Sequence, residues 1–135
     1  MANQIKLLLV DDEPAVRRGL RMRLELEPDV QIVGEAVNGS QAVQMAEAMH
    51  DGVVVMDIEM PVMNGIDATS EITSRLPGVA IVVLSMHDDA ATIGRARKAG
   101  AAAFIAKRSM DDSLIEAIRS AARGQGGASD DSDSN

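Results

Sequence analysis

Four short apolar runs, each followed at once by a polar side chain, constrain the fold of this chain more than any other feature. The strands of a parallel sheet are buried on both faces, so they read as unbroken apolar runs rather than as alternating patterns. Ligands of open α/β sheets bind beyond the carboxyl ends of such strands. We therefore expect three carboxylates, a hydroxyl and an ammonium to gather at one edge of one sheet. The runs and the polar residues after them are 5–10 with Asp11 and Asp12, 53–56 with Asp57, 80–84 with Ser85, and 102–106 with Lys107.

Helical patterns separate these runs, so strands and helices alternate along the chain. Pro14 sits where a first helix begins, because proline tolerates the first helical position, and Gly100 is a stop signal for the fourth helix. A shorter, edge-like strand is expected at 31–36. The alternation predicts a doubly wound, five-stranded parallel sheet of the α/β class. The expected helices run from Pro14 to Pro28, from Asn38 to Met49, near 66–76, near 89–98, and from Ser109 or Asp111 to Ala122.

The last residues differ from the rest in composition. Residues 124–135 are rich in Gly, Ser and Asp and carry nothing to bury, so they predict a flexible acidic tail or linker. Residues 1–123 are then one folded domain, long enough for a core of its own.

Charge and composition exclude several classes of protein. The formal net charge is −8, which disfavours direct binding to nucleic acid and favours divalent cations or a basic partner surface. Four arginines at 17, 18, 21 and 23 are interpreted as a solvated helix face. The chain has no cysteine and no apolar stretch of membrane-spanning length. We expect a cytoplasmic protein without a membrane partner, whose core is aliphatic because Phe104 is its only aromatic residue.

The residues at the expected sheet edge suit metal-dependent phosphoryl chemistry. A Mg²⁺-type ion takes oxygen ligands, and Asp11, Asp12 and Asp57 supply carboxylates. With the metal bound, Asp57 becomes a candidate nucleophile that forms an aspartyl-phosphate. Lys107 and Ser85 add an ammonium and a hydroxyl for the phosphoryl oxygens. Any one of these side chains could merely cap a loop or a helix, but all of them together favour a site.

Four blocks of sequence then resemble a known family, the response-regulator receiver domains of two-component signalling, which have a flavodoxin-like (βα)5 fold. The similarity spans residues 5–123. The resemblance implies that Asp57 accepts a phosphoryl group from a histidine kinase or phosphotransfer protein. It also implies that Ser85 and Lys107 hold that group and that Phe104 is the switch aromatic. The blocks are 8–13, 56–65, 83–85 and 104–107.

The same resemblance implies a metal site for Mg²⁺ or Mn²⁺. Asp12 would bind the ion directly, Asp11 mainly through water, and Asp57 through its carboxylate. The backbone carbonyl of Glu59 would complete the ligands from the protein. Activity would be limited to self-phosphorylation and slow autodephosphorylation, so the chain would not be an enzyme with turnover.

Further blocks at 85–89, 98–101 and 116–119 resemble the subfamily that usually carries a C-terminal helix-turn-helix domain. That subfamily suggests a homodimer on phosphorylation, while a stand-alone receiver and a fragment of a larger regulator both stay open. One departure is Arg108, where the family commonly has proline after a cis bond. A cis bond before a non-proline residue costs roughly 2.5–4 kcal/mol, so we expect a trans bond here.

Two other functions remain as alternatives. A haloacid-dehalogenase-like phosphatase also uses an aspartate at a strand end with an acid two residues later, which Asp57 and Glu59 match loosely. A constitutive pseudo-receiver would bind partners without phosphorylation. For a receiver, we expect the switch within residues 85–107, because the helix near 89–98 is weakly specified. Its expected inward residues are Ala90, Ile93, Ala96 and Ala99.

Overall fold

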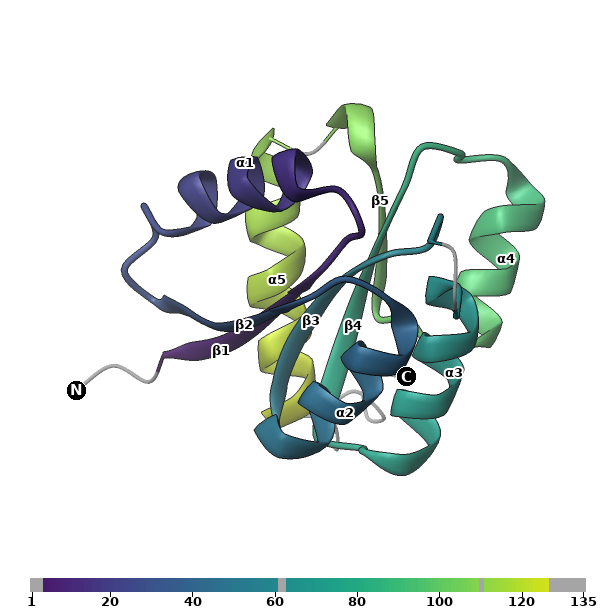
Figure 1. The fold of residues 1–135 in the computed structure, drawn as a ribbon, viewed down its shortest axis with the longest axis horizontal. Coiled ribbons are helices and arrows are strands. Elements are labelled where there is room, and N and C mark those ends of the chain that lie inside the picture. Colours follow the sequence, from purple (N-terminus) through teal and green to yellow (C-terminus); the bar gives the residue numbers. More distant parts are fainter. Residues whose placement is uncertain (1–3, 61–62, 110, 127–135) are drawn as a thin grey trace.

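The computed structural model describes residues 4–60, 63–109 and 111–126, and strands and helices alternate along them as expected (Figure 1). Three helices begin at side chains that accept the backbone N–H three residues further on, namely Asn38, Asn64 and Asp89. The elements are β1 (Ile5–Val10), α1 (Pro14–Leu24), β2 (Val30–Ala36), α2 (Gly39–Met49), β3 (Gly52–Asp57), α3 (Gly65–Arg75), β4 (Val79–Ser85), α4 (Ala90–Lys98), β5 (Ala103–Ala106), the 3-10 turn η1 (Lys107–Ser109) and α5 (Asp111–Gly126).

The five strands form one parallel sheet in the order β2-β1-β3-β4-β5. The chain therefore starts near the middle of the sheet, moves outward to β2, and crosses back to β3 before it continues to β5. β2 is an edge strand, as expected, but at 7 residues it is not shorter than β1 or β3. The doubly wound α/β fold expected from the sequence is confirmed.

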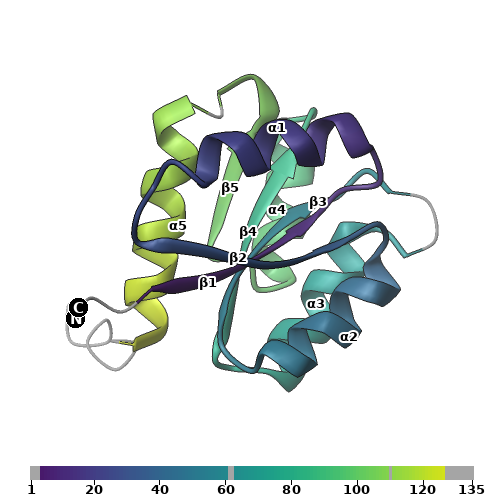
Figure 2. The ribbon, with the colours of Figure 1, turned by 60° about the vertical axis from the view of Figure 1, so that its left-hand side comes forward.

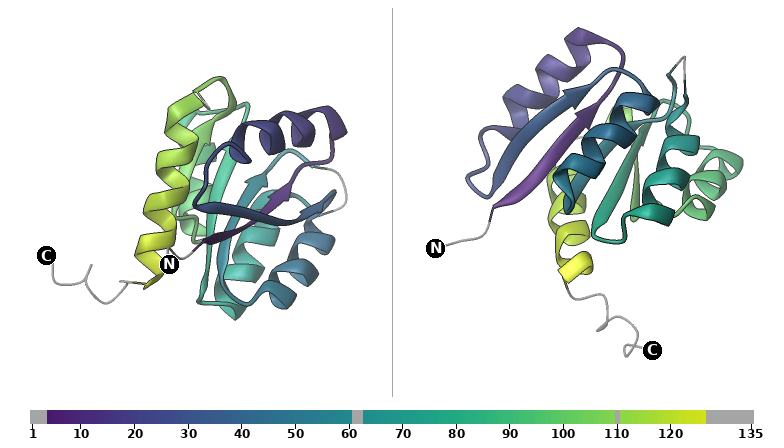
Figure 3. Two further views of the ribbon diagram at one scale, coloured as in Figure 1. Left: turned by 90° about the vertical axis from the view of Figure 1, so that its left-hand side faces the viewer. Right: turned by 60° about the horizontal axis from the view of Figure 1, so that its bottom comes forward.

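Helices cover both faces of the sheet and create two separate cores (Figures 2 and 3). Along β1, Leu7 and Leu9 face the core under α1 and α5, whereas Leu8 and Val10 face the core under α2, α3 and α4. Successive strand side chains point to opposite faces, so unbroken apolar strands serve both cores at once. Both cores are aliphatic, as the sequence predicted, and buried methionines at 49, 56 and 60 contribute to the core under α2–α4.

The arginines on α1 form the expected solvated face only in part, because Arg18 is exposed whereas the Arg17 side chain is largely buried. The Arg17 and Arg21 side chains each donate to the carboxylate of Glu35 on β2, at 2.8 and 2.7 Å. Arg23 forms an ion pair with Glu27 one helical turn later. These contacts pair Arg17, Arg21 and Arg23 with acids of the same fold.

Several boundaries differ from the sequence prediction. α1 ends at Leu24, before Pro28, and α5 continues to Gly126, beyond the expected domain end at residue 123. Most of the predicted tail, Pro61 and the capping side chains of Ser109 and Asp111 lie outside what the structure describes. In the described part of the chain, no helix combines the length and the apolar character needed to cross a membrane.

Two local features also differ. β2 carries an extra residue, because Leu7 pairs with Ile32 while Leu8 pairs with Gly34, so Val33 is a bulge. On α4, Ala90 is exposed instead of buried and Thr92 is buried in its place. The small side chains of this helix carried too little hydrophobic signal to define its inward face.

Candidate functional site

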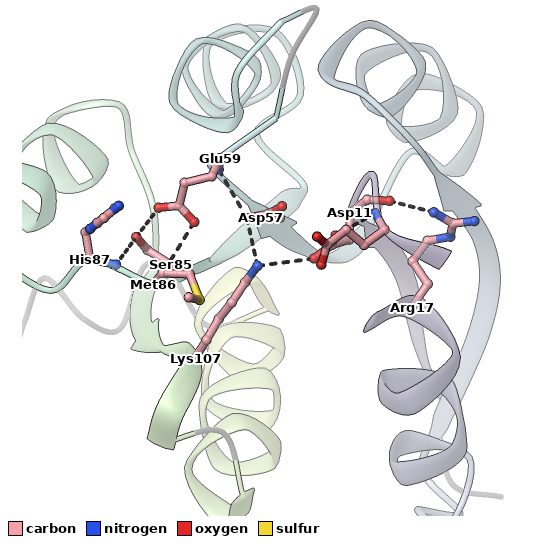
Figure 4. A network of polar contacts seen from close by, with 9 residues as sticks. Asp11, Arg17, Asp57, Glu59, Ser85, Met86, His87 and Lys107 are labelled. Atoms are coloured by element: carbon pink, nitrogen blue, oxygen red, sulfur yellow. Dashed lines mark hydrogen bonds and ion pairs between the residues drawn. The ribbon is translucent and has the colours of Figure 1, made fainter. Parts of the chain in front are cut away.

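The polar residues that follow the central strands meet at the carboxyl edge of the sheet (Figure 4). The parallel register aligns the strand ends, because Val10 pairs with Met56 and Asp57 pairs with Leu84. The gathering that the sequence predicted is therefore observed. The residues brought together are Asp11 and Asp12 after β1, Asp57 at the end of β3, Ser85 at the end of β4, and Lys107 after β5.

Three carboxylates form the centre of the site. Ligand oxygens of Asp11, Asp12 and Asp57 all lie within 4.8 Å of one another. Asp11 and Asp57 are each only 1% exposed, whereas Asp12 is open to solvent. The Lys107 ammonium lies between the two buried acids, 3.4 Å from an Asp11 oxygen and 3.2 Å from an Asp57 oxygen. The Lys107 ammonium thus pairs with two of the three clustered acids.

The pKa values of Asp57 and Lys107 are both shifted by burial and by the negative charge of this cluster. Burial, and then the neighbouring charge of Asp11, raise the pKa of Asp57 to about 7. A backbone N–H from Glu59 and the ammonium of Lys107 oppose that shift without cancelling it. Burial lowers the pKa of Lys107, but the charges of Asp57 and Asp11 outweigh it and the net direction is upward. A divalent cation among these oxygens would relieve the repulsion, so the donor set fits a Mg²⁺-type ion.

Local backbone contacts hold the acids in place. Asp11 Oδ1 accepts the backbone N–H of Glu13 at 2.9 Å, and Asp57 Oδ1 accepts that of Glu59 at 3.1 Å. α3 begins directly against β3, where a Cβ on Gly65 would lie 2.4 Å from the backbone oxygen of Asp57. Only glycine lets the helix start this close to the site.

Arg17 supports the site from α1, a role that sequence reasoning missed. Its Nη1 donates to the backbone carbonyl of Asp11 at 2.7 Å, while its Nε binds Glu35. Its side chain is 15% exposed. Because an arginine on a helix surface usually reaches solvent, only the placement of β2 beside β1 brings Glu35 near enough to fix it.

Ser85 is engaged differently from Lys107. Its hydroxyl is fully buried and donates to the Glu59 carboxylate at 2.6 Å. The Ser85 hydroxyl oxygen also accepts the backbone N–H of His87 at 2.9 Å. The Glu59 carboxylate in turn accepts the backbone N–H of Met86 at 3.2 Å. Among the contacts of the described residues, no hydrogen bond joins Ser85 to Asp57 or Lys107. The sequence analysis used only the backbone of Glu59, and nothing in the pattern pointed to its carboxylate.

Two further residues frame the site. Phe104 is half-buried on β5, opposite Val83 of β4, and lines a cavity of about 50 Å³ together with Ile93 and Ala96 of α4. Arg108 follows Lys107 through a trans peptide bond, as expected, and its guanidinium pairs with Asp88 in the loop before α4.

The response regulator receiver domain family matches residues 7–119 of this chain. The chain belongs to this family. It is a receiver domain of a two-component response regulator, and the family match runs from within β1 to within α5 and includes all the site residues. The expectation drawn from the sequence blocks is confirmed.

Named relatives agree with that assignment. The transcriptional regulatory protein DegU of Brevibacillus brevis is 37% identical over 122 residues, which cover 90% of this chain and 52% of DegU. The nitrate/nitrite response regulator NarL of Escherichia coli is 32% identical over 127 residues, 93% of this chain and 59% of NarL. The chain therefore spans little more than half the length of these relatives.

A solved structure gives the same result. A LuxR-family two-component response regulator from an Aurantimonas species superposes with a TM-score of 0.85 at 32% identity, covering 90% of this chain and 87% of that one. The fold and the family are thus supported independently by sequence and by shape.

Proposed function

We propose that this receiver is a phosphorylation-dependent switch in which Asp57 accepts a phosphoryl group from a histidine kinase or phosphotransfer protein. The observation that carries the proposal is the ion pair of Lys107 with both Asp57 and Asp11. An ammonium at this position is within reach of an oxygen of any phosphoryl group placed on Asp57. Membership of the receiver family supports the same chemistry.

The transfer step needs an ionised Asp57. Its carboxylate oxygen forms the new P–O bond while the P–N bond of the donor's phosphohistidine breaks, and the imidazole leaves with the bonding electron pair. Because the pKa of Asp57 is raised to about 7, about half of the protein molecules carry a protonated Asp57 near neutral pH when no cation is bound. Positive charge close to the carboxylate therefore makes the nucleophile available as well as neutralising the phosphoryl oxygens.

Mg²⁺ (or Mn²⁺) would supply that charge, and the residues to hold it are Asp12, Asp11, Asp57 and the backbone carbonyl of Glu59. Asp12 suits direct ligation because its carboxylate is exposed beside the two buried acids. Arg17 and the N–H of Glu13 keep Asp11 oriented toward the same point. When bound, the ion neutralises charge on the transferring phosphoryl group.

Phosphorylation is proposed to change the segment 85–107, which contains Ser85, α4 and Phe104, and so to control partner binding or dimerisation. The space beside Phe104 and the few buried side chains of α4 support this location. The longer relative DegU is named as a transcriptional regulatory protein, so a role in transcription through another domain of a full-length protein is part of the proposal. A cytoplasmic location is also proposed, on family membership alone.

The proposal is tested by incubating the protein with Mg²⁺ and acetyl phosphate or beryllofluoride. We expect a mass increase of one phosphoryl group with acetyl phosphate and NMR shifts across residues 85–107 with the mimic. Asp57→Asn should abolish both responses, whereas Lys107→Ala should keep metal binding and lose most of the shifts. An unchanged response in Asp57→Asn would contradict the assignment of the acceptor.

The alternatives make different predictions in the same experiments. A phosphatase would turn over an added phosphate ester many times, while a receiver loses only its own phosphoryl group. A pseudo-receiver would show no Mg²⁺-dependent labelling at all. Sedimentation of the mimic-bound protein tests the proposed homodimer, and hydrogen exchange should change most across residues 85–107.

A further inference from the structure

The single proton of the Ser85 hydroxyl is already engaged in this structure. A serine hydroxyl has one proton to donate and accepts through its lone pairs. Here the proton goes to the Glu59 carboxylate, and an accepting lone pair takes the N–H of His87. The bond to Glu59 joins a buried hydroxyl to a charged acceptor, which is a strong class of hydrogen bond.

Glu59 also binds the chain that follows Ser85. Its second oxygen accepts the backbone N–H of Met86, so one carboxylate connects the loop after β3 to the start of the loop before α4. In Figure 4 the Glu59 side chain turns toward Ser85, while Lys107 reaches toward Asp57 and Asp11 from another direction. Ser85 and Lys107, the two residues expected to hold a phosphoryl group, therefore have different partners in the unphosphorylated protein.

We propose that the Glu59 carboxylate is an internal competitor of the phosphoryl group. In the unphosphorylated protein it holds the Ser85 proton that a phosphoryl oxygen on Asp57 would need. This inference rests on the proposed function, and it makes Glu59 a positioning residue that acts through Ser85. The competition is exclusive because the hydroxyl has a single proton.

Charge and space favour the release of Glu59 when Asp57 is phosphorylated. A phosphoryl group and a carboxylate repel one another, so both cannot share the same donor at low cost. Beside Glu59 lies a cavity of about 330 Å³ that is also lined by Asn64, His87 and Arg95. On release from Ser85 the carboxylate would enter this space, which is lined by Arg95 of α4 and also by Asp67.

Release would also free the loop before α4. The N–H of Met86 loses its carboxylate partner in the same step that transfers Ser85 to the phosphoryl oxygen. Glu59 thus couples the chemical event to the segment that was proposed as the switch. In the resting state it keeps that segment in its present position.

The experiment titrates beryllofluoride into the full chain at saturating Mg²⁺ and follows bound fluoride by ¹⁹F NMR. Glu59→Ala removes the charged competitor and should tighten the apparent affinity for beryllofluoride about tenfold. The free energy of one hydrogen bond to a charged group corresponds to a change in affinity of about that size. Glu59→Gln keeps one acceptor without the charge, so its affinity for beryllofluoride should lie between those of the wild type and Glu59→Ala. Glu116→Ala removes a charge from an exposed site on α5 and serves as the matched control, which should stay within about twofold of the wild type.

The Ser85→Ala background separates competition from simple repulsion. Without the hydroxyl there is nothing to compete for, so the gain from Glu59→Ala should shrink to about twofold or less in the double variant. The Mg²⁺ affinity of each variant is measured separately, and backbone NMR spectra confirm that each is folded. Glu59→Gln remains as a test if Glu59→Ala does not fold.

The outcomes are distinct. If the wild type takes up no mimic, the proposed function fails. If the wild type binds but Glu59→Ala binds equally or more weakly, this inference is overturned and the proposed function stands. It is also overturned if the gain persists undiminished in the Ser85→Ala background, or if it follows a change in Mg²⁺ affinity.

Discussion

α5 and α4 lie on opposite faces of the sheet and both pack against β5, yet they are held to the sheet very differently. α5 packs against β3, β4 and β5 through a stripe of large aliphatic side chains that includes Leu114, Ile115 and Ile118. α4 packs against β5 and α3 and buries only Thr92 and Ala96. The helix α5 is therefore firmly packed on its face of the sheet, whereas α4 is weakly held on the other face. The weakly held face directly follows Ser85, so the site connects to the part of the fold that is easiest to move.

The largest effect is expected on the firmly packed face. Ile118→Ala on α5 removes a fully buried side chain, which should lower the free energy of unfolding by about 4 kcal/mol. Urea unfolding followed by far-UV circular dichroism measures this. A loss below about 1 kcal/mol would contradict the picture of α5 as the firmly packed helix.

A second prediction concerns Asp57 and the dependence of stability on pH. The folded-state pKa of Asp57 is raised to about 7 from 3.8, so between these values the folded protein binds more protons than the unfolded chain. Stability of the metal-free protein should therefore fall as pH rises from about 4 to about 7, by a contribution of about 3 kcal/mol from this group.

Asp57→Asn is the control for that dependence. The variant should lose this part of the slope and should be more stable than the wild type at pH 7.5. Added Mg²⁺ should stabilise the wild type more at pH 7.5 than at pH 5, because the ion needs ionised ligands. A wild-type stability that rises between pH 5 and pH 7 while Asp57→Asn stays flat would contradict the raised pKa.

A smaller effect is expected on the weakly held face. Ile93 of α4 is only half-buried and borders the cavity beside Phe104, so Ile93→Ala should cost about 1 kcal/mol. Hydrogen exchange should nevertheless accelerate across α4, because this side chain is the largest aliphatic one of α4 that lines that cavity. If Ile93→Ala costs as much as Ile118→Ala, the contrast between the two helices does not hold.

The smallest effect concerns the ion pair across the mouth of the site. Arg108→Ala and Asp88→Asn each remove the contact between the residue after Lys107 and the loop before α4. Both side chains are exposed, so each change should alter stability by no more than about 0.5 kcal/mol. Asp51→Asn, which removes another exposed ion pair, is the control. A loss above about 1 kcal/mol in Arg108→Ala alone would show that this contact holds the loop.

Much of the site could be predicted because it depends on strand ends. Each apolar run located a strand, and the parallel arrangement then placed Asp11, Asp57 and Lys107 at one edge. The start of the second helix at Asn38 could also be predicted, because capping depends on residues within one turn. The inward face of α4 could not be read, since small side chains give little periodic contrast between Ala90 and Thr92.

The sequence by itself determined the alternation of strands and helices, the parallel sheet and the edge where the acids meet, because these follow from local hydrophobic pattern and chain connectivity. Tertiary structure alone decided which groups the acids and hydroxyls bind. Ser85 and Glu59 are 26 residues apart, and Arg17 and Glu35 are 18 apart, so no local period relates them. Their contacts exist because β4 lies beside β3 and β2 lies beside β1, which brings side chains from separate loops within hydrogen-bonding distance.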